Sequence, residues 1–116
     1  PAAHQASVPA LLALPQPPTC ILFPDDFSAI GGLNTIAAAG LRVPDDISVA
    51  GYDGIYLSQT MSPRLTTYRQ DTAALGRTAA ARLIELIEKP RTTVMDRTVV
   101  TGALLPGGTV ARPCTE

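Results

Sequence analysis

Two short, largely apolar runs most constrain what this chain can fold into. They are residues 19–23 and residues 47–52, and each is followed within a few positions by aspartate. Apolar runs of this length, without alternation of polar residues, are typical of strands buried in a parallel sheet. Between them Phe27, Ile30 and Ala37 recur at helical spacing, and Gly40 suits the position just after a helix. The pattern predicts a strand, a helix and a second strand.

The rest of the chain continues this alternation. Residues 65–70 are β-branched and extended, and Asp71 or Thr72 can cap a long helix that ends at Lys89 and Pro90. Its apolar face comprises Leu75, Ala79, Leu83, Leu86 and Ile87. We further expect a short helix within residues 1–18 with Pro9 in its first turn, a loop over 55–64, and strands over 97–105 and 110–112.

This order of elements predicts an α/β fold, a parallel sheet with flanking helices. We expect a residual helix and Pro-rich connection in residues 1–18, one domain in residues 19–112, and a tail in residues 113–116. The predicted strands are few for such a sheet, so we expect further strands upstream of this sequence.

Composition limits the possible partners. The formal net charge is −1 and the nine basic residues are scattered, so this polypeptide alone is predicted to bind DNA poorly. No apolar stretch approaches the roughly 18 residues of a membrane span, so we expect no membrane partner and a cytoplasmic location. Cys20 lies in an apolar run and is expected to be buried, whereas Cys114 is expected to be a free thiol near the tail.

Carboxylates follow both apolar runs. Ligands of open α/β sheets lie beyond the carboxyl ends of the strands, and Asp25, Asp26 and Asp53 are all predicted at that edge. Asp26 precedes Phe27 directly and is expected chiefly to cap a helix at the edge of the cleft. For Asp25 and Asp53 a turn role and a ligand role are both open. Ionised carboxylates are pure acceptors, which favours ligands rich in hydroxyl groups or cationic, such as sugars, nucleosides and polyols.

Catalytic chemistry finds less support in the sequence. A phosphoryl-transfer site would pair the acids with a lysine or a glycine-rich phosphate loop, but Lys89 is the only lysine and no such loop occurs. A hydrolase triad needs histidine, and the single histidine, His4, lies in the unpatterned N-terminal segment. We therefore expect a protein that is not an enzyme and holds neither a metal nor a cofactor.

The order of motifs resembles that of LacI/GalR-family transcription regulators. Residues 23–31, FPDDFSAIG, resemble the strand-end A-N-D-x-x-A-x-G motif of that family. Four more matches follow in family order: residues 39–49, residues 51–53, residues 63–70 and residues 75–83. The resemblance implies the C-terminal part of a two-lobed sensor domain similar to periplasmic binding proteins. It also implies a homodimer that binds operator DNA through a helix-turn-helix domain absent from this chain.

The resemblance also implies roles for single residues. Asp53, with Tyr52 in the same Gly-Tyr-Asp motif, is the best candidate effector contact, and Gln70 is a weaker one. Asp25 stands where the family usually has asparagine, which replaces a donor and acceptor with an acceptor alone. Gly54 replaces a frequent second acid.

Family dimers pack partly through the helix after Asp26 and the loop before Pro63. This implicates four apolar residues, for which burial in the chain's own core is an equally open interpretation: Ile30, Leu33, Leu57 and Met61. An exposed Met61 would favour the interface.

The leading hypothesis is therefore ligand sensing and dimerisation for a DNA-binding repressor that responds to a sugar or a nucleoside-like molecule. The alternative is a solute-binding protein of a sugar transporter with the same fold, and a carboxylate-dependent enzyme is a third possibility.

Overall fold

The computed structural model describes residues 4–94 and 96–114, without the side chains of His4 and Gln5. By its internal contacts the chain divides into two units. The first, which we call the sheet unit, comprises residues up to 69 together with those from 104 onward. The second, the helix unit, comprises residues 70–103. Each is described by itself, and the domain boundaries expected from the sequence stay a prediction.

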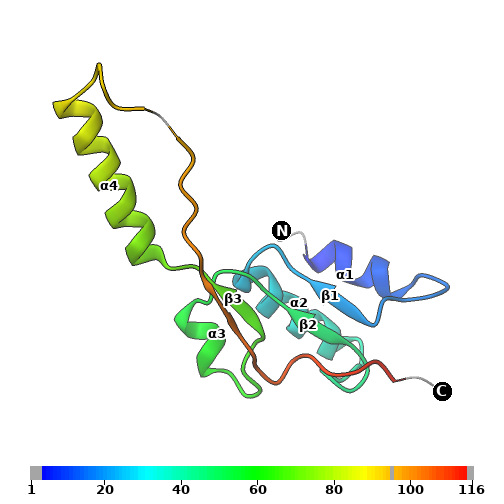
Figure 1. Ribbon diagram of the computed structural model, residues 1–116. Helices are drawn as coiled ribbons and strands as arrows, with labels where there is room; N and C mark the ends of the chain where they lie inside the picture. Colours follow the sequence, from blue (N-terminus) through cyan, green and yellow to red (C-terminus); the bar gives the residue numbers. More distant parts are fainter. Residues whose placement is uncertain (1–3, 95, 115–116) are drawn as a thin grey trace. The chain divides into compact units, whose positions relative to one another are not determined.

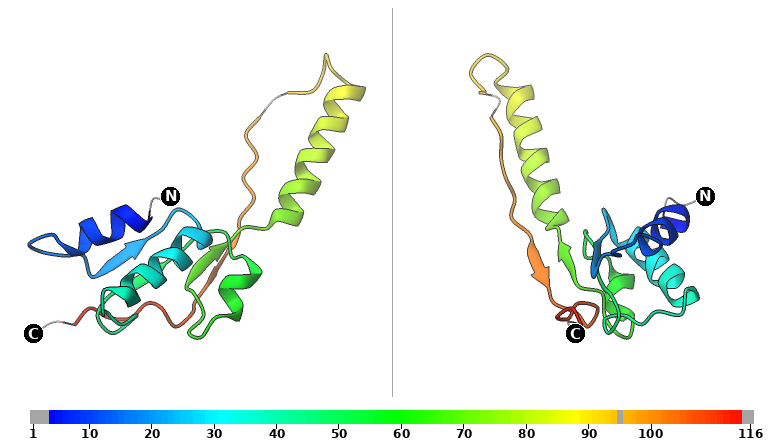
Figure 2. Two further views of the ribbon diagram at one scale, coloured as in Figure 1. Left: turned by 180° about the vertical axis from the view of Figure 1, so that it is seen from behind. Right: turned by 90° about the vertical axis from the view of Figure 1, so that its right-hand side faces the viewer.

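A parallel strand pair forms the centre of the sheet unit. Strand β1 (Cys20–Leu22) pairs with β2 (Ser48–Ala50) in parallel, with Ile21 opposite Val49. Helices α1 (His4–Leu12) and α2 (Asp26–Ala38) lie behind this pair in Figure 1, and the right-hand view of Figure 2 shows both on the same side of it. The predicted α/β class with a parallel sheet is confirmed.

The core lies between this strand pair and the two helices. Its members are small aliphatic side chains and one phenylalanine: Val8, Ile21, Phe23, Ala29, Ile36, Ile47, Val49 and Leu65. Phe23 passes so close to α2 that any side chain at Gly32 would overlap its ring. This contact explains why α2 tolerates a glycine, which costs about 0.5–1 kcal/mol in a helix interior.

The face of β1 opposite to the core is not covered by other described residues of the sheet unit. Leu22 is 73% exposed and Cys20 is exposed, while Ile21 between them is buried. The prediction that Cys20 is buried is therefore wrong: side chains alternate along a strand, and Cys20 lies on the uncovered face. Cys114 is exposed and free, as predicted.

Strand β3 (Thr67–Arg69) extends the parallel order beside β2 through isolated bridges between Ala50 and Thr66 and between Asp53 and Arg69. It also pairs with β4 (Ala103–Leu105). Of the predicted strand 97–105 only this last part is strand, and the predicted strand 110–112 is wrong.

Side-chain hydroxyls hold the C-terminal segment instead of a strand ladder. Thr109 Oγ1 accepts the Thr66 amide at 3.0 Å and donates to the Val49 carbonyl at 2.6 Å. Ser48 Oγ bonds both the carbonyl and the amide of Ala111, at 3.1 and 3.0 Å.

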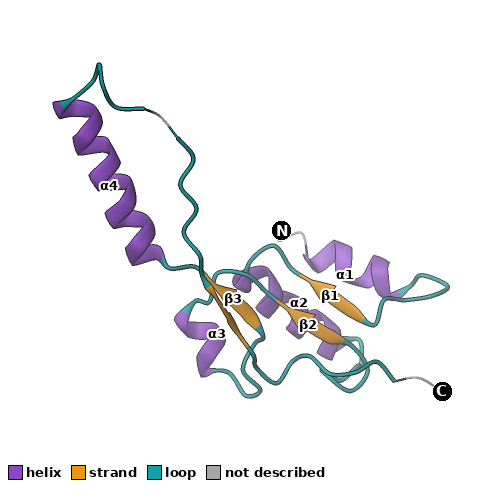
Figure 3. Ribbon diagram, in the orientation of Figure 1, coloured by secondary structure: helices purple, strands orange, loops and turns teal. Residues whose placement is uncertain are grey.

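The helix unit contains α4 (Thr72–Glu88), which Figure 3 shows as a long helix. Asp71 caps it by accepting the Ala74 amide at 2.9 Å, and the helix ends before Lys89, both as predicted. None of its residues is buried within the described chain. No helix among residues 4–94 and 96–114 is long and apolar enough to cross a membrane.

Two further predictions of secondary structure are wrong. The segment 55–64, expected to be loop, contains the short helix α3 (Tyr56–Thr60), whose five residues are too few to show a period. Helix α1 begins at His4, so Pro9 lies inside it rather than in its first turn. A weak amphipathic pattern does not fix where a helix starts.

Candidate functional site

Parallel pairing brings the predicted acidic residues to one edge of the sheet. Leu22 at the end of β1 lies opposite Ala50 at the end of β2. Asp25 and Asp26 lie in the segment that follows β1, and Asp53 lies in the segment that follows β2. The edge therefore gathers carboxylates from separate parts of the chain, as expected from the direction of the strands.

The structure gives the cap role expected for Asp26 to Asp25. Asp25 is the cap of α2: its Oδ1 accepts the Ser28 amide at 2.7 Å and its Oδ2 accepts the Ser28 hydroxyl at 3.2 Å. Asp26, predicted to be that cap, is the first residue of the helix itself. The helix begins one residue earlier than expected, because Asp25 rather than Asp26 has the extended backbone of a capping residue.

Asp26 is instead a buried hydrogen-bond acceptor. Its side chain is 0% exposed, and Oδ1 accepts the Thr67 hydroxyl at 2.6 Å while Oδ2 accepts the Ile55 amide at 2.9 Å. A side chain at Gly51 would overlap this carboxylate. Sequence reasoning missed the role, since both partners are distant in the sequence.

The turn that carries Asp53 has an unusual backbone. Asp53 has a φ of 119° and Gly54 a φ of 71°. Positive φ is costly for a residue with a Cβ atom, so the surrounding structure must hold Asp53 in place. Its amide donates to the Tyr68 carbonyl at 2.9 Å, and its side chain is half-buried. Backbone outliers of this kind cluster at ligand sites. The ligand role expected for Asp53 stays a prediction.

An aromatic pair lies beside this turn. Tyr52, which is 41% exposed, stacks on Tyr68 with a centroid separation of 5.7 Å and an interplanar angle of 14°. A hollow of about 340 Å³ is lined by Tyr52, Leu22, Phe23 and Pro24. Tyr52 was predicted from the sequence as a ligand contact, but Tyr68 was not, because its position in β3 beside the Gly-Tyr-Asp motif depends on strand pairing.

A second hollow adjoins the first. It measures about 220 Å³ and shares Leu22, Phe23 and Pro24 with it, and it extends to Ser7 and Leu11 of α1 and to Ser28 of α2. Together the two hollows offer apolar surface and a few hydroxyl groups along the edge that bears the carboxylates. This combination suits a ring with one apolar face and several hydroxyl groups.

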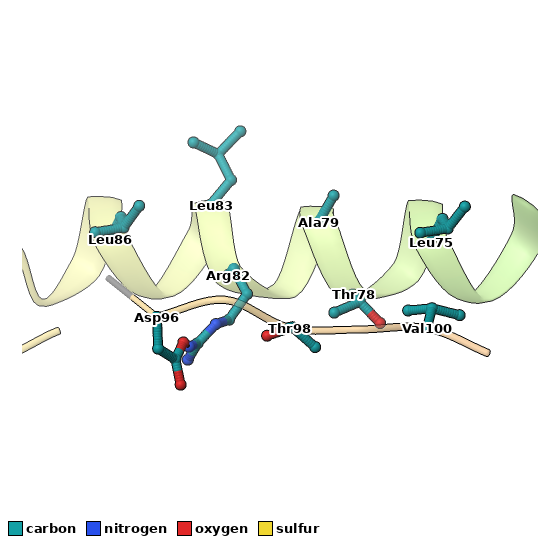
Figure 4. A pocket seen from close by; sticks show the side chains of 9 residues that line it. All are labelled: Leu75, Thr78, Ala79, Arg82, Leu83, Leu86, Asp96, Thr98 and Val100. Atoms are coloured by element: carbon teal, nitrogen blue, oxygen red, sulfur yellow. The ribbon is translucent and has the colours of Figure 1, made fainter. Parts of the chain in front are cut away.

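The helix unit has a hollow of its own, about 330 Å³ in volume. Figure 4 shows its lining side chains on α4 and on the extended segment 96–100, with Arg82 and Asp96 directed toward each other. These two residues form an ion pair, and Arg82 also pairs with Glu85 at 3.3 Å. Since the charges are paired and the rest of the lining is largely apolar, this hollow is a weaker candidate for a polar ligand.

The remaining predicted residues are placed as follows. Gln70 is half-buried and is the first residue of the helix unit, so its relation to Asp53 stays a prediction. Leu33 and Met61 pack against the core of the sheet unit, so Met61 lacks the exposure that would have favoured an interface. Ile30 is half-buried, whereas Leu57 on α3 is 49% exposed. Their role in a dimer stays a prediction.

Within the described residues, no group of three or more His, Cys, Asp or Glu side chains could hold a metal ion.

Comparison with known proteins identifies the fold family. Residues 2–110 match the periplasmic binding protein-like domain. The chain is 49% identical over 82 residues to the probable HTH-type transcriptional repressor ExuR of Bacillus subtilis strain 168, which covers 71% of this chain and 25% of that protein. Other curated relatives are also HTH-type transcriptional repressors. The chain spans about a quarter of the length of such relatives.

Solved structures agree with this match. The LacI-family regulator of Arthrobacter sp. FB24, crystallised in complex with lactose, is 31% identical with a TM-score of 0.80, over 95% of this chain and 41% of that one. The lac repressor dimer bound to operator and the anti-inducer ONPF is 31% identical with a TM-score of 0.83, over 94% and 37%. The chain therefore belongs to the periplasmic binding protein-like domain family, in the form carried by LacI-family transcriptional regulators.

Proposed function

We propose that this chain senses a small-molecule effector for a cytoplasmic, dimeric LacI-family repressor that binds operator DNA through a separate helix-turn-helix domain. The observation that carries the proposal is the strained Asp53 turn beside the exposed Tyr52 ring, at the edge where β1 and β2 end. The curated relatives and the lac repressor are transcriptional repressors, which supports this function over that of a transporter's solute-binding protein.

The chemistry of this edge supports a neutral, hydroxylated ring as the effector. Asp53 and Asp25 are acceptors for hydroxyl groups, and Tyr52 with the adjoining hollow offers an apolar face against which a ring can stack. Sugars and nucleosides both have these features. The lactose complex of the Arthrobacter regulator shows that a protein of this family accommodates such a molecule.

The mechanism we propose is a shift between two arrangements of the sensor lobes. An effector that binds one arrangement better than the other changes the population of the DNA-binding state, by a coupling free energy typically of about 1–3 kcal/mol. The dimer is required because two DNA-binding heads must match half-sites about one helical turn, or a multiple of it, apart.

The test is the substitution Asp53→Ala in the full-length regulator. Calorimetric titration with lactose, galactose and cytidine should show that the variant binds the active compound about tenfold or more weakly, because a hydrogen bond to a charged group is lost. Operator binding without effector should be unchanged. An unaltered titration would contradict the assignment of Asp53.

Asp45→Ala is the matched control. Asp45 is an exposed aspartate in the turn before β2, at the amino end of the same strand, and its ion-pair distance to Arg42 is 3.8 Å. It should bind the effector as the wild type does, because exposed pairs of this kind contribute little. A loss of affinity equal to that of Asp53→Ala would mean that the effect is not local.

A further inference from the structure

The buried carboxylate of Asp26 lies behind the turn that carries Asp53. Two backbone amides of the segment after β2 bond to β3 or to the residue directly before it: Asp53 donates to the Tyr68 carbonyl and Gly51 to the Thr66 carbonyl, both at 2.9 Å. The next alternate amide is that of Ile55, and the left-handed backbone of Gly54 redirects the chain before it. The Ile55 amide donates to Asp26 Oδ2 instead. A side chain from α2 thus supplies the acceptor where the strand pairing stops.

The same carboxylate joins three elements that are labelled in Figure 1: α2, β3 and α3. Asp26 is the first residue of α2, its partner Thr67 is the first residue of β3, and its partner Ile55 directly precedes α3. The Ile55 carbonyl is held as well, since it accepts the Ser58 hydroxyl at 2.7 Å and the Ser58 amide at 3.1 Å. Asp26, Thr67 and Ser58 are all buried. The peptide groups on both sides of Ile55 are therefore fixed.

We infer that Asp26 is a positioning residue: it sets the geometry of the Asp53 turn and relates that turn to the starts of α2 and α3. This inference rests on the proposed effector role of Asp53. A movement of the turn on ligand binding must alter the Asp26 hydrogen bonds or carry α2 and α3 with it. Those helices bear Ile30 and Leu57, two of the candidate dimer contacts, so Asp26 links the ligand edge to the elements that carry them.

The geometry distinguishes two substitutions at this position. Asn in place of Asp26 keeps an oxygen that can accept the Ile55 amide, and its amino group can donate to the Thr67 hydroxyl oxygen. Ala leaves the Ile55 amide and the Thr67 hydroxyl buried without a partner. Thr67→Val is a milder perturbation, because it removes one hydrogen bond and nearly preserves the shape of the side chain.

The experiment compares Asp26→Asn, Asp26→Ala and Thr67→Val with wild type in the full-length regulator. NMR-detected amide exchange is measured at Ile55 and, for reference, at Ile36 in the interior of α2, and lactose affinity is measured by calorimetry. We expect Ile55 to exchange about tenfold or more faster in Asp26→Ala, less so in Thr67→Val, and nearly as in wild type in Asp26→Asn. The exchange rate of the Ile36 amide should stay unchanged. Lactose affinity should fall most in the variant whose Ile55 amide exchanges fastest, and least in the variant whose Ile55 amide exchanges most slowly.

Opposite results would overturn the inference. If Ile36 exchange rose as much as Ile55 exchange, Asp26 would serve general stability rather than the turn. If Thr67→Val left both Ile55 exchange and lactose affinity unchanged, the positioning role would be refuted even if Asp26→Ala did not fold. If wild type bound no lactose, the lactose-sensing form of the proposed function would fail, while the exchange data would still decide the positioning role.

Discussion

Replacing Gly54 by alanine tests the geometry of the effector turn most sharply. A Cβ atom at this position would lie 2.6 Å from the Arg69 Cα, which belongs to the backbone and has little room to move. The φ of 71° adds the cost of a left-handed conformation, about 1–2 kcal/mol. Overpacking against a neighbour typically costs about 1–3 kcal/mol. We therefore expect Gly54→Ala to destabilise the protein by about 2–5 kcal/mol.

Gly40→Ala provides the matched control. Gly40 follows α2 with a φ of 79°, but no atom lies within 4 Å of the place where its Cβ would be. Its substitution should cost only the free energy of holding an alanine in a left-handed backbone conformation, about 1–2 kcal/mol. The change in unfolded-state entropy is common to both variants and cancels in the comparison.

The assay is urea unfolding followed by circular dichroism, with both variants measured beside wild type. Gly54→Ala should be less stable than Gly40→Ala by about 1–3 kcal/mol, which is the cost of the overlap between the added Cβ atom and Arg69. Equal free energies of unfolding for the two variants would refute the close approach of the turn to β3. Since the Asp53 amide donates to the Tyr68 carbonyl in this region, the same variant should also weaken effector binding.

Two further predictions concern the core and the turn before β2. Ile36 is fully buried. In urea unfolding, Ile36→Ala should therefore lower the free energy of unfolding by about 2–5 kcal/mol, and Ile36→Val by only about 0.5–1.5 kcal/mol. Similar values for the two variants would place Ile36 outside the core. The Arg42 amide, which donates to Asp46 Oδ2 at 2.7 Å, and the Arg42 side chain hold the pKa of Asp46 below its ordinary value. Because the folded pKa is the lower one, this interaction stabilises the fold above the unfolded pKa and is lost as pH falls through the folded pKa. NMR titration of the Asp46 carboxyl should show the lowered pKa, and an ordinary value would contradict the contact.

The sequence predicted the features that depend on local pattern. The two largely apolar runs identified β1 and β2, and Gly40 and Asp71 marked helix ends, because capping and turn chemistry act within a few residues. The parallel order of strands then placed Asp25 and Asp53 at one edge, as expected.

What the sequence did not predict depends on contacts between distant residues. The cap was assigned one residue too late, because either aspartate satisfies the local rule and only the partners of Asp26, Ile55 and Thr67, decide between them. The stacking of Tyr52 on Tyr68 likewise requires the pairing of β2 with β3. Residues 110–112 resemble a strand in composition, but they form no strand. The side-chain hydroxyl groups of Ser48 and Thr109 bond the C-terminal segment to the sheet instead.

A structure of the full-length regulator with its bound effector tests the central claim most directly. We predict that a ligand hydroxyl lies within hydrogen-bond distance of the Asp53 carboxylate, at about 2.6–3.2 Å, with a ring against Tyr52 and the adjoining hollow. An effector bound away from the edge where β1 and β2 end, without contact to Asp53, would contradict the proposed site.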